Sequence, residues 1–412
     1  MALPTLAEVE RDLRTLLQEG GFYRPGEEIL PLEKALGRVL AASPRATITL
    51  PPFPRAHYDG FALRAEGAAP GKVLPVAGEI AMGKEAPRPL RGDEAWSITT
   101  GGHLPPGADA VVPLEDVDIL EKAIRLKKPV QKGQYVTPEG ADVKAGEELL
   151  AAGRRLGPMD LSLLWAAGVR EVAVYRKPKA ALFLTGSEIR PPHLPLLPGT
   201  VWDSLSPSLA PWLSSWGWEV EVLGPFPEDP GALQRAMEES LSKASLGIVI
   251  GGSSRGKGDG TAEAVAALPG GEVLGHGIAI QPGRPTLWGR ARGPEGKDAL
   301  ILGLPGHPVS ALLVFFLLGF PASRHLAGEI HPWARGKVKA RLAEGVQAGA
   351  YEFIARVELR CDQEGLCWAH VLKGDSAIMK SLAGSHGFLR LPPGDRREAG
   401  QEVEVELWMS FA

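Results

Sequence analysis

The sequence ALILGLPGHPVS, residues 299–310, carries the pattern on which the predicted fold rests: an apolar run that leads directly into a loop of small residues. Similar apolar runs precede it, namely AALFLTG at 180–186, EVEVLGPF at 219–226 and LGIVIGG at 246–252. Near-continuous apolar strands between helices are typical of a parallel sheet that is covered on both faces. Residues 179–327 are therefore predicted to form an α/β domain.

Three of these strands end in glycine-containing loops, at Leu184–Glu188, Gly251–Asp259 and Leu304–Ser310. Glycine lets backbone N–H groups approach an anion closely, and the start of a following helix favours negative charge. Ligands of such sheets bind beyond the carboxyl ends of the strands. Three loops at one edge therefore suggest a phosphate-bearing ligand, although a plain turn explains any single loop.

The middle loop has a second interpretation. Gly251, Gly256 and Lys257 match the first seven positions of a P-loop, G-x-x-x-x-G-K. The eighth position must be Ser or Thr to hold magnesium, and it is Gly258 here. A P-loop kinase is therefore the remote alternative.

The remaining chain indicates three further regions. Residues 5–20 and 31–42 show helical periodicity with charged faces, and helical texture returns at 158–167. Short Val- and Ile-containing runs broken by Pro and Gly lie between them, and further β-rich runs follow His331. The predicted domains are a helical linker domain (1–45 and 146–178), a β-rich insert domain (46–145), the α/β domain (179–327) and a C-terminal β domain (328–412).

Charge and cysteine content exclude several function classes. The chain has 45 Lys and Arg against 49 Asp and Glu, so its formal net charge of −4 argues against nucleic acid as a partner. Its two cysteines, Cys361 and Cys367, have the spacing of neither a zinc knuckle nor a redox pair, and a disulfide-stapled secreted fold would need more of them.

The sequence also argues against a membrane. The N-terminus is amphipathic, with acidic residues in its first turns, unlike a signal peptide. The most apolar run, 309–320, is bounded by Pro308 and Pro321 and is too short to span a bilayer. It is predicted to be a buried helix, and a cytoplasmic location is expected.

Nine motifs distributed along the chain resemble one family. They are PLEKALGRVLA (31–41), PPFPRAHYDGFALRA (51–65), TTGGHLPPGADAVVPLEDV (99–117), GADVKAGEELL (140–150), TGSEI (185–189), IGGSSRGKGD (250–259), QPGRP (281–285), LPGHPVSALL (304–313) and GDSAIMKSLAGSHGFLRLP (374–392). In this order and spacing they resemble the molybdopterin molybdenumtransferases, the family of MoeA and the gephyrin E domain.

The resemblance implies both a fold and a reaction. The implied fold is α/β plus β: an elongated multidomain protomer with a three-layer α/β molybdopterin-binding domain, a β-rich insert domain and a C-terminal β domain. The implied enzyme inserts molybdate into adenylylated molybdopterin and releases AMP and molybdenum cofactor, with Mg²⁺ as cofactor. A homodimer is implied, whose active cleft lies between the α/β domain of one protomer and the YDG-bearing insert domain of the other. Other proteins of molybdenum cofactor biosynthesis are candidate partners.

The resemblance also implies site residues. The catalytic set is Asp59, Thr100, Asp142, Glu188 and Asp259, of which Asp59, Glu188 and Asp259 are the expected magnesium ligands. The molybdopterin- and phosphate-binding set is Asp203, Ser204, Gly251, Gly252, Ser254, Gly256, Pro305, Gly306 and Ser310, and the molybdate-binding set is Arg284, Arg356 and Ser376. Carboxylates suit a magnesium ion that also binds substrate phosphates, and arginine suits an oxyanion.

Several of these residues have a simpler structural interpretation. Asp59-Gly60 is a favoured hairpin turn. Asp203 has the side chain of a helix N-cap, and Arg284 lies in a Pro- and Gly-rich segment typical of a solvated turn. Asp142 and Glu188 are residues of a type usually found on the surface.

The chain departs from the family pattern near the expected molybdate pocket. Two family lysines correspond to Gln281 and Arg284, a family arginine to Tyr351, and a family asparagine to His307, while Arg255 is an added charge. Low molybdate affinity with ordinary nucleotide affinity is therefore expected. The alternative function is a diverged paralogue that binds molybdopterin nucleotide as a scaffold without efficient metal insertion.

Overall fold

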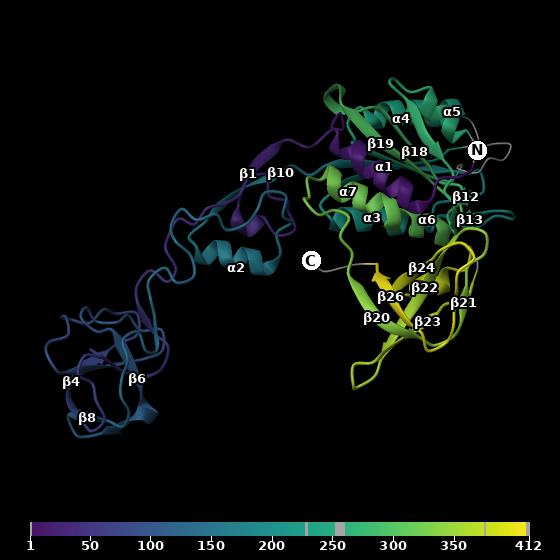
Figure 1. The fold of residues 1–412 in the computed structure, drawn as a ribbon. Coiled ribbons are helices and arrows are strands. Elements are labelled where there is room, and N and C mark those ends of the chain that lie inside the picture. The colour runs from purple at the N-terminus through teal and green to yellow at the C-terminus, as the bar shows by residue number, and fades with distance from the viewer. Residues whose placement is uncertain (1, 227–229, 252–259, 375, 409–412) are drawn as a thin grey trace.

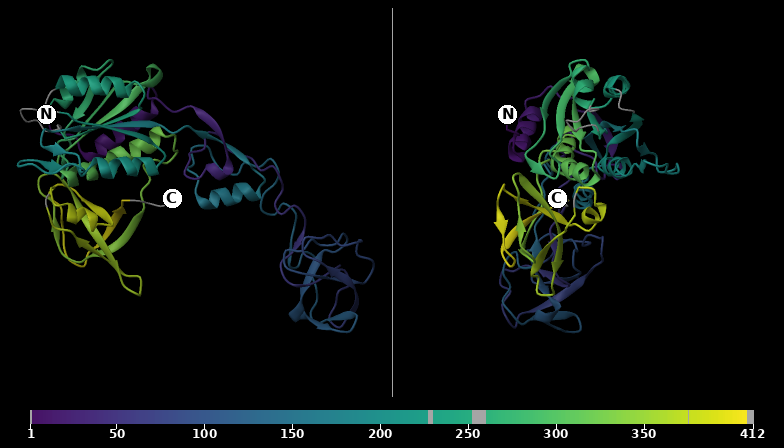
Figure 2. Two further views of the ribbon diagram at one scale, coloured as in Figure 1. Left: turned by 180° about the vertical axis from the view of Figure 1, so that it is seen from behind. Right: turned by 90° about the vertical axis from the view of Figure 1, so that its right-hand side faces the viewer.

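The computed structural model describes residues 2–226, 230–251, 260–374 and 376–408. These residues form an elongated molecule (Figure 1), with the α/β domain and the C-terminal β domain together at one end and the insert domain at the other. A narrow middle part connects the two ends, and Figure 2 shows the same separation from behind. The predicted elongated α/β-plus-β architecture is therefore confirmed.

The α/β domain is built on a six-stranded sheet. In spatial order its strands are β14 (Glu219–Phe226), β11 (Lys179–Thr185), β15 (Leu246–Ile250), β19 (Asp298–Leu304), β18 (Leu287–Arg292) and β16 (Glu272–His276). The first four are parallel, as the apolar runs predict. The last two are antiparallel, so the sheet is mixed and not purely parallel.

Helices cover both faces of this sheet, which gives the predicted three layers. Successive strand residues point to opposite faces: Leu182 joins the core under α1 (Leu6–Gln18), α3 (Ser206–Ser215), α6 (Pro308–Val314) and α7 (Phe320–Leu326). Its neighbour Phe183 joins the core under α4 (Pro230–Leu241) and α5 (Thr261–Ala266).

Helix α1 packs on the α/β sheet. Thr5 and Glu8 form a capping box at its start. Its apolar face, with Leu6, Val9, Leu13 and Leu17, is buried in the core of the α/β domain. The division of the chain into four domains stays a prediction, but α1 contributes to the α/β core even though its residues fall within the range expected for the linker.

The helix expected at residues 31–42 is a wrong prediction. The segment starts at the end of β1 (Glu27–Pro31), which pairs with β10 (Glu171–Tyr175), and continues as a short 3₁₀ turn, Leu32–Lys34. Gly37 then has a φ of +73°, which ends any helical path, and Leu40 forms a β-bridge with Val174. The apolar residues whose spacing suggested a helix at 31–42 lie instead in a turn followed by extended chain. The helix predicted at 158–167 is present as α2 (Pro158–Ala166).

The insert domain is a small β structure. Its sheet has the order β6 (Ala110–Pro113), β3 (Gly60–Leu63), β5 (Ala95–Ile98), β4 (Val73–Ile80), β8 (Ala123–Leu126) and β7 (Val117–Ile119). A short ribbon of β2 (Arg55–Ala56) and β9 (Val136–Thr137) lies beside it, and a 3₁₀ turn spans Leu114–Asp116.

The C-terminal domain contains a third six-stranded sheet, and one of its strands comes from the α/β domain. Its strands are β17 (Ile280–Gln281), β22 (Glu352–Cys361), β23 (Cys367–Val371), β20 (Lys337–Leu342), β26 (Glu402–Leu407) and β24 (Gly387–Leu391), with helix α8 (Met379–Ala383) and a ribbon of β21 (Val346–Gln347) and β25 (Arg396–Arg397) beside them. Strand β17 comes from the α/β domain and pairs Gln281 with Phe353.

Cys361 and Cys367 are cross-strand neighbours on β22 and β23, and a disulfide joins them. The sequence spacing did not predict this pairing.

The apolar segment after the third loop forms a continuous buried helix. Helix α6, a π-helical turn (Phe315–Gly319) and α7 follow one another over Pro308–Leu326, a stretch apolar and long enough to span a membrane by composition, yet 89% of its most apolar window is buried in the protein. The predicted burial is confirmed, but Pro321 does not end the helix. Proline provides no N–H to the preceding turn of the helix, and the Arg335 guanidinium donates to the Phe316 and Leu317 carbonyls of that turn at 3.4 and 2.6 Å.

Candidate functional site

The strands that lead into the three small-residue loops end at one edge of the α/β sheet. Strands β11, β15 and β19 are adjacent and parallel, so their carboxyl ends coincide. The Thr185 hydroxyl donates to the Ile250 carbonyl at 3.1 Å, and the Gly251 N–H donates to the Leu304 carbonyl at 3.2 Å. Gly251 has a φ of +89°, and a Cβ there would lie 2.9 Å from the Thr185 carbonyl oxygen, so glycine is required. The predicted common edge is confirmed.

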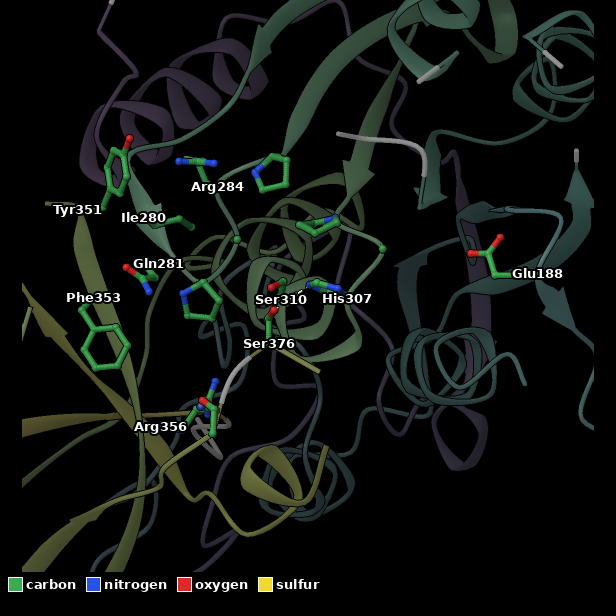
Figure 3. A pocket seen from close by; sticks show the side chains of 16 residues that line it. Glu188, Ile280, Gln281, Arg284, His307, Ser310, Tyr351, Phe353, Arg356 and Ser376 are labelled. Atoms are coloured by element: carbon green, nitrogen blue, oxygen red, sulfur yellow. Dashed lines mark hydrogen bonds between the residues drawn. The ribbon is translucent and has the colours of Figure 1, made fainter. Parts of the chain in front are cut away.

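A cavity of about 830 Å³ lies beside this edge, between the α/β domain and the C-terminal domain. Seven of the residues predicted from the sequence line it: Glu188, Arg284, Pro305, Gly306, Ser310, Arg356 and Ser376. Figure 3 shows Ser310, His307 and Ser376 close together near the centre of this cavity, with Glu188 at its other side.

Two guanidinium groups from different domains give the cavity its positive charge. Arg284 follows β17, and its guanidinium carbon lies 5.5 Å from the centre of the Tyr351 ring, a cation–π contact. Arg356 on β22 is only 3% exposed, and its Nη2 donates to the Gly374 carbonyl at 2.5 Å. Guanidinium groups present a planar fork of donors, which suits an oxyanion.

Two hydroxyl groups also line the cavity. Ser310 lies in the first turn of α6 and is buried. Ser376 belongs to the C-terminal domain and is held at the start of the same helix, because its carbonyl accepts from the Val309 N–H at 3.1 Å. The Ser376 Oγ is 2.8 Å from the Nδ1 atom of His307. The cavity thus presents hydroxyl and guanidinium donors from two domains.

Glu188 provides the carboxylate of the cavity. It follows Gly186, whose φ is +124°, and a Cβ at Gly186 would lie 2.7 Å from a carboxylate oxygen of Glu188. The Glu188 side chain therefore folds back over a backbone position that only glycine can occupy.

Asp203 and Ser204 do not line the cavity. Asp203 is buried, and its Oδ1 accepts from the N–H groups of Leu205 and Ser206, each at 3.0 Å, at the start of α3. The Ser204 carbonyl accepts from the Ser208 hydroxyl at 3.0 Å. The contacts of Asp203 satisfy free N–H groups at a helix start, as its structural interpretation predicts, and the predicted ligand contacts of both residues stay predictions.

Asp59 and Thr100 form a pair in the insert domain. The Asp59 Oδ1 accepts from the Thr100 N–H at 2.6 Å and from the Thr100 hydroxyl at 2.9 Å. The backbone hydrogen bond, followed by the hydroxyl, lowers the pKa of Asp59 below its ordinary value, so the carboxylate is ionised at neutral pH. Asp142 has an exposed side chain at the other border of this domain.

The predicted catalytic residues therefore fall into two groups within one chain. Asp59 and Thr100 belong to the insert domain, whereas Glu188 belongs to the α/β domain at the opposite end of the molecule (Figure 1). Gly252, Ser254, Gly256 and Asp259 lie outside the described residues. Within residues 2–226, 230–251, 260–374 and 376–408, no three His, Cys, Asp or Glu side chains gather closely enough to hold a metal ion.

Sequence reasoning missed part of the cavity lining. His307, Gln281 and Tyr351 line it, and all three were identified only as departures from the family pattern. Their positions within or near the motifs were the available signal. Ile280 and Phe353 had no such signal, because their place in the cavity depends on the β17–β22 pairing.

Comparison with known proteins assigns all three parts of the chain to one family. Residues 6–168 match the MoeA N-terminal region (domain I and II), residues 181–325 a probable molybdopterin binding domain, and residues 339–408 the MoeA C-terminal region (domain IV). A Synechococcus elongatus protein named molybdopterin molybdenumtransferase is 33% identical over 391 residues, covering 92% of this chain and 94% of that protein. A Haemophilus influenzae protein of the same name is 32% identical over 73% of each chain.

Solved structures agree with this assignment. A molybdopterin biosynthesis MoeA protein from Pyrococcus horikoshii is 34% identical, with full coverage of both chains and a TM-score of 0.77. A second structure of a MoeA protein from that organism is 28% identical and has a TM-score of 0.78, with 98% of this chain covered. The similarity extends over the α/β domain, the insert domain and the C-terminal domain together. The chain belongs to the molybdopterin molybdenumtransferase family.

Proposed function

We propose that this chain is a molybdopterin molybdenumtransferase, which inserts molybdate into adenylylated molybdopterin and releases AMP and molybdenum cofactor. The observation that carries the proposal is the cavity in which Arg284, Arg356, Ser310 and Ser376 converge at the carboxyl edge of the α/β sheet. Molybdate is a dianion, and the guanidinium and hydroxyl donors of this cavity match its oxygens. The scaffold alternative has no support, since the full-length relatives are named as transferases.

The two substrates occupy neighbouring parts of the site. The oxyanion lies between Arg284 and Arg356, where donors from both domains surround it. The pyrophosphate of the nucleotide lies along the strand ends, where Gly251 and Gly306 allow a close approach of the backbone. The cavity thus holds molybdate next to the end of the substrate that carries the phosphates, which brings the reacting groups together.

Magnesium is part of the proposal. Ionised carboxylates are its preferred protein ligands, and Asp59, held in the ionised form by Thr100, has this chemistry, as does Glu188. With Asp259 they would bind an ion that offsets the negative charge of the pyrophosphate when it is present. A single chain holds Asp59 and Glu188 in domains at its opposite ends, so the donor set fits magnesium only if two chains contribute.

We therefore propose a homodimer in which the insert domain of one protomer covers the cavity of the other. This arrangement adds Asp59 and Thr100 to Glu188, Arg284 and Arg356. It also accounts for the exposed position of the Asp59–Thr100 pair. A cytoplasmic location and contacts with other molybdenum cofactor biosynthesis proteins complete the proposal.

The activity is tested by incubating the protein with adenylylated molybdopterin, magnesium and molybdate, and by measuring both AMP and active molybdenum cofactor. We expect both products to depend on molybdate. Arg284→Gln should raise the molybdate concentration needed for half-maximal rate about ten- to a hundredfold, because a charge-assisted contact is lost. Arg292→Gln is the matched control, since Arg292 is exposed, lies outside this cavity and donates to the Gly296 carbonyl. Absence of molybdate-dependent products would refute the function.

A further inference from the structure

The His307 side chain lines the cavity and does not cap its own helix. His307 occupies the N-cap position of the long helix that begins with α6, with extended backbone angles. N-cap side chains usually accept a hydrogen bond from the first turn of the helix, but the imidazole of His307 forms no such bond. Its Nδ1 atom instead lies 2.8 Å from the Ser376 Oγ, and both residues line the cavity.

Ser376 is fixed in two ways. Its carbonyl accepts the Val309 N–H from the first turn of α6, which docks this segment of the C-terminal domain on the α/β domain. Its side chain is then oriented by His307. The backbone contact does not involve the imidazole, so the two effects are separable. The Val309 N–H fixes the position of the Ser376 backbone, and His307 fixes the orientation of the Ser376 hydroxyl.

The hydrogen bond between His307 and Ser376 can run in two directions. If Nδ1 has no proton, it accepts the Ser376 hydroxyl proton, and Oγ then turns only lone pairs toward the cavity. If Nδ1 carries a proton, it donates to Oγ, and the hydroxyl proton can rotate toward a ligand. An oxyanion has only lone pairs, so it requires the second arrangement. The exposed position of His307 leaves Nε2 accessible to water in that tautomer.

We propose that His307 is a positioning residue for molybdate: its Nδ1–H donates to Ser376 Oγ and thereby leaves the Ser376 hydroxyl proton for an oxygen of the bound oxyanion. The inference rests on the proposed function, because it assumes that the cavity between Arg284 and Arg356 receives molybdate. His307 acts only through Ser376 and does not touch the substrate.

A double-mutant cycle tests this coupling. His307→Ala should raise the KM for molybdate about three- to tenfold, the range of one neutral hydrogen bond, while the KM for adenylylated molybdopterin stays unchanged. Ser376→Ala should raise the molybdate KM at least as much. The double variant should equal Ser376→Ala alone, since His307 has nothing left to orient. Effects of the two substitutions that multiply, or a rise in both KM values, would overturn the proposal.

A conservative variant separates donation from mere packing. His307→Asn can present an amide N–H near the position of Nδ1, so the molybdate KM should return to within about twofold of the wild type. If His307→Asn is as impaired as His307→Ala, a donor at this position is not what matters, and the proposal fails. This variant also serves if His307→Ala folds poorly. His331→Ala, an exposed histidine outside this cavity, is the control for a histidine-to-alanine change.

The outcome distinguishes the inference from the function on which it rests. A wild-type protein that produces molybdenum cofactor, with a molybdate KM that His307→Ala leaves unchanged, contradicts only the role of His307. A wild-type protein without molybdate-dependent products overturns both.

Discussion

At the scale of single residues, Gln281 is the departure with the clearest consequence. It lines the cavity together with Arg284 and Arg356, and the lysine of the family pattern would place a third cation there. Tyr351, the other departure, is not simply a lost charge, since its ring lies against the Arg284 guanidinium. The cation–π contact restrains the Arg284 guanidinium. This part of the cavity therefore carries less positive charge than the family pattern, but its guanidinium group is held in position.

We therefore expect Gln281→Lys to lower the molybdate concentration needed for half-maximal rate, by up to about tenfold, with little change in nucleotide affinity. The added ammonium group interacts with the oxyanion and lies away from the strand-end loops. Gln347→Lys, on the exposed ribbon of the C-terminal domain, adds the same charge outside the cavity and should have no effect. Equal molybdate titrations for Gln281→Lys and the wild type would show that Gln281 does not face the bound oxyanion.

At the scale of elements, the long buried helix depends on a side chain far from it in sequence. Pro321 removes one N–H donor to the preceding turn, and Arg335 donates to the Phe316 and Leu317 carbonyls of that turn. The same guanidinium lies 3.3 Å from carboxylate oxygens of Glu10 on α1 and Glu406 on β26. Arg335 thus joins the helix, the N-terminal helix and the C-terminal sheet.

Arg335→Met should lower the free energy of unfolding by about 2–4 kcal/mol, because it leaves a buried carbonyl and the Glu10 carboxylate without this donor. Urea denaturation measures the loss. Lys337→Met is the control: Lys337 pairs with Glu404 on the surface, with about half of each side chain exposed, so it should cost at most about 1 kcal/mol. A similar small loss of unfolding free energy for both variants would mean that the hydrogen bonds from Arg335 to the turn before Pro321 do not stabilise the protein.

Elements that depend on contacts between residues close in sequence could be predicted, whereas those that depend on contacts between distant residues could not. Strands β11, β15 and β19 are recognisable because apolar runs and glycine loops are local patterns. The segment 31–42 has the same apolar spacing as a helix, but pairing with β10 and with Arg155 makes it a turn and extended chain. Helix continuation through Pro321 depends on Arg335, which no local pattern reveals.

The site shows the same limit. Arg284, Ser310 and Ser376 were predicted because they lie in motifs, Arg356 was predicted from the family resemblance outside the nine motifs, and all four line the cavity. The structural role of Asp203 was visible as a cap pattern, and its contacts agree with it. Phe353 reaches the cavity only because β17 leaves the α/β domain and joins the sheet of the C-terminal domain. Such long-range pairing cannot be read from one sequence.

At the scale of the whole molecule, the distance between the insert domain and the cavity is the feature that requires explanation. The chain keeps an ionised Asp59 and its partner Thr100 at one end and a cationic cavity with Glu188 at the other. An elongated protomer with complementary site residues at its ends is suited to a symmetric dimer with two shared sites. The central claim is that molybdate insertion takes place in such a shared site.

The most direct measurement is molybdate-dependent AMP release by mixtures of two inactive proteins, Asp59→Ala and Glu188→Ala, after verified subunit exchange. Random pairing makes half of the dimers mixed, and each mixed dimer has one site with both native residues, so about a quarter of the wild-type activity should return. The double variant Asp59→Ala/Glu188→Ala, mixed with wild type, should instead inactivate both sites of each mixed dimer. No recovery from the two single variants, despite demonstrated exchange, would contradict the shared site.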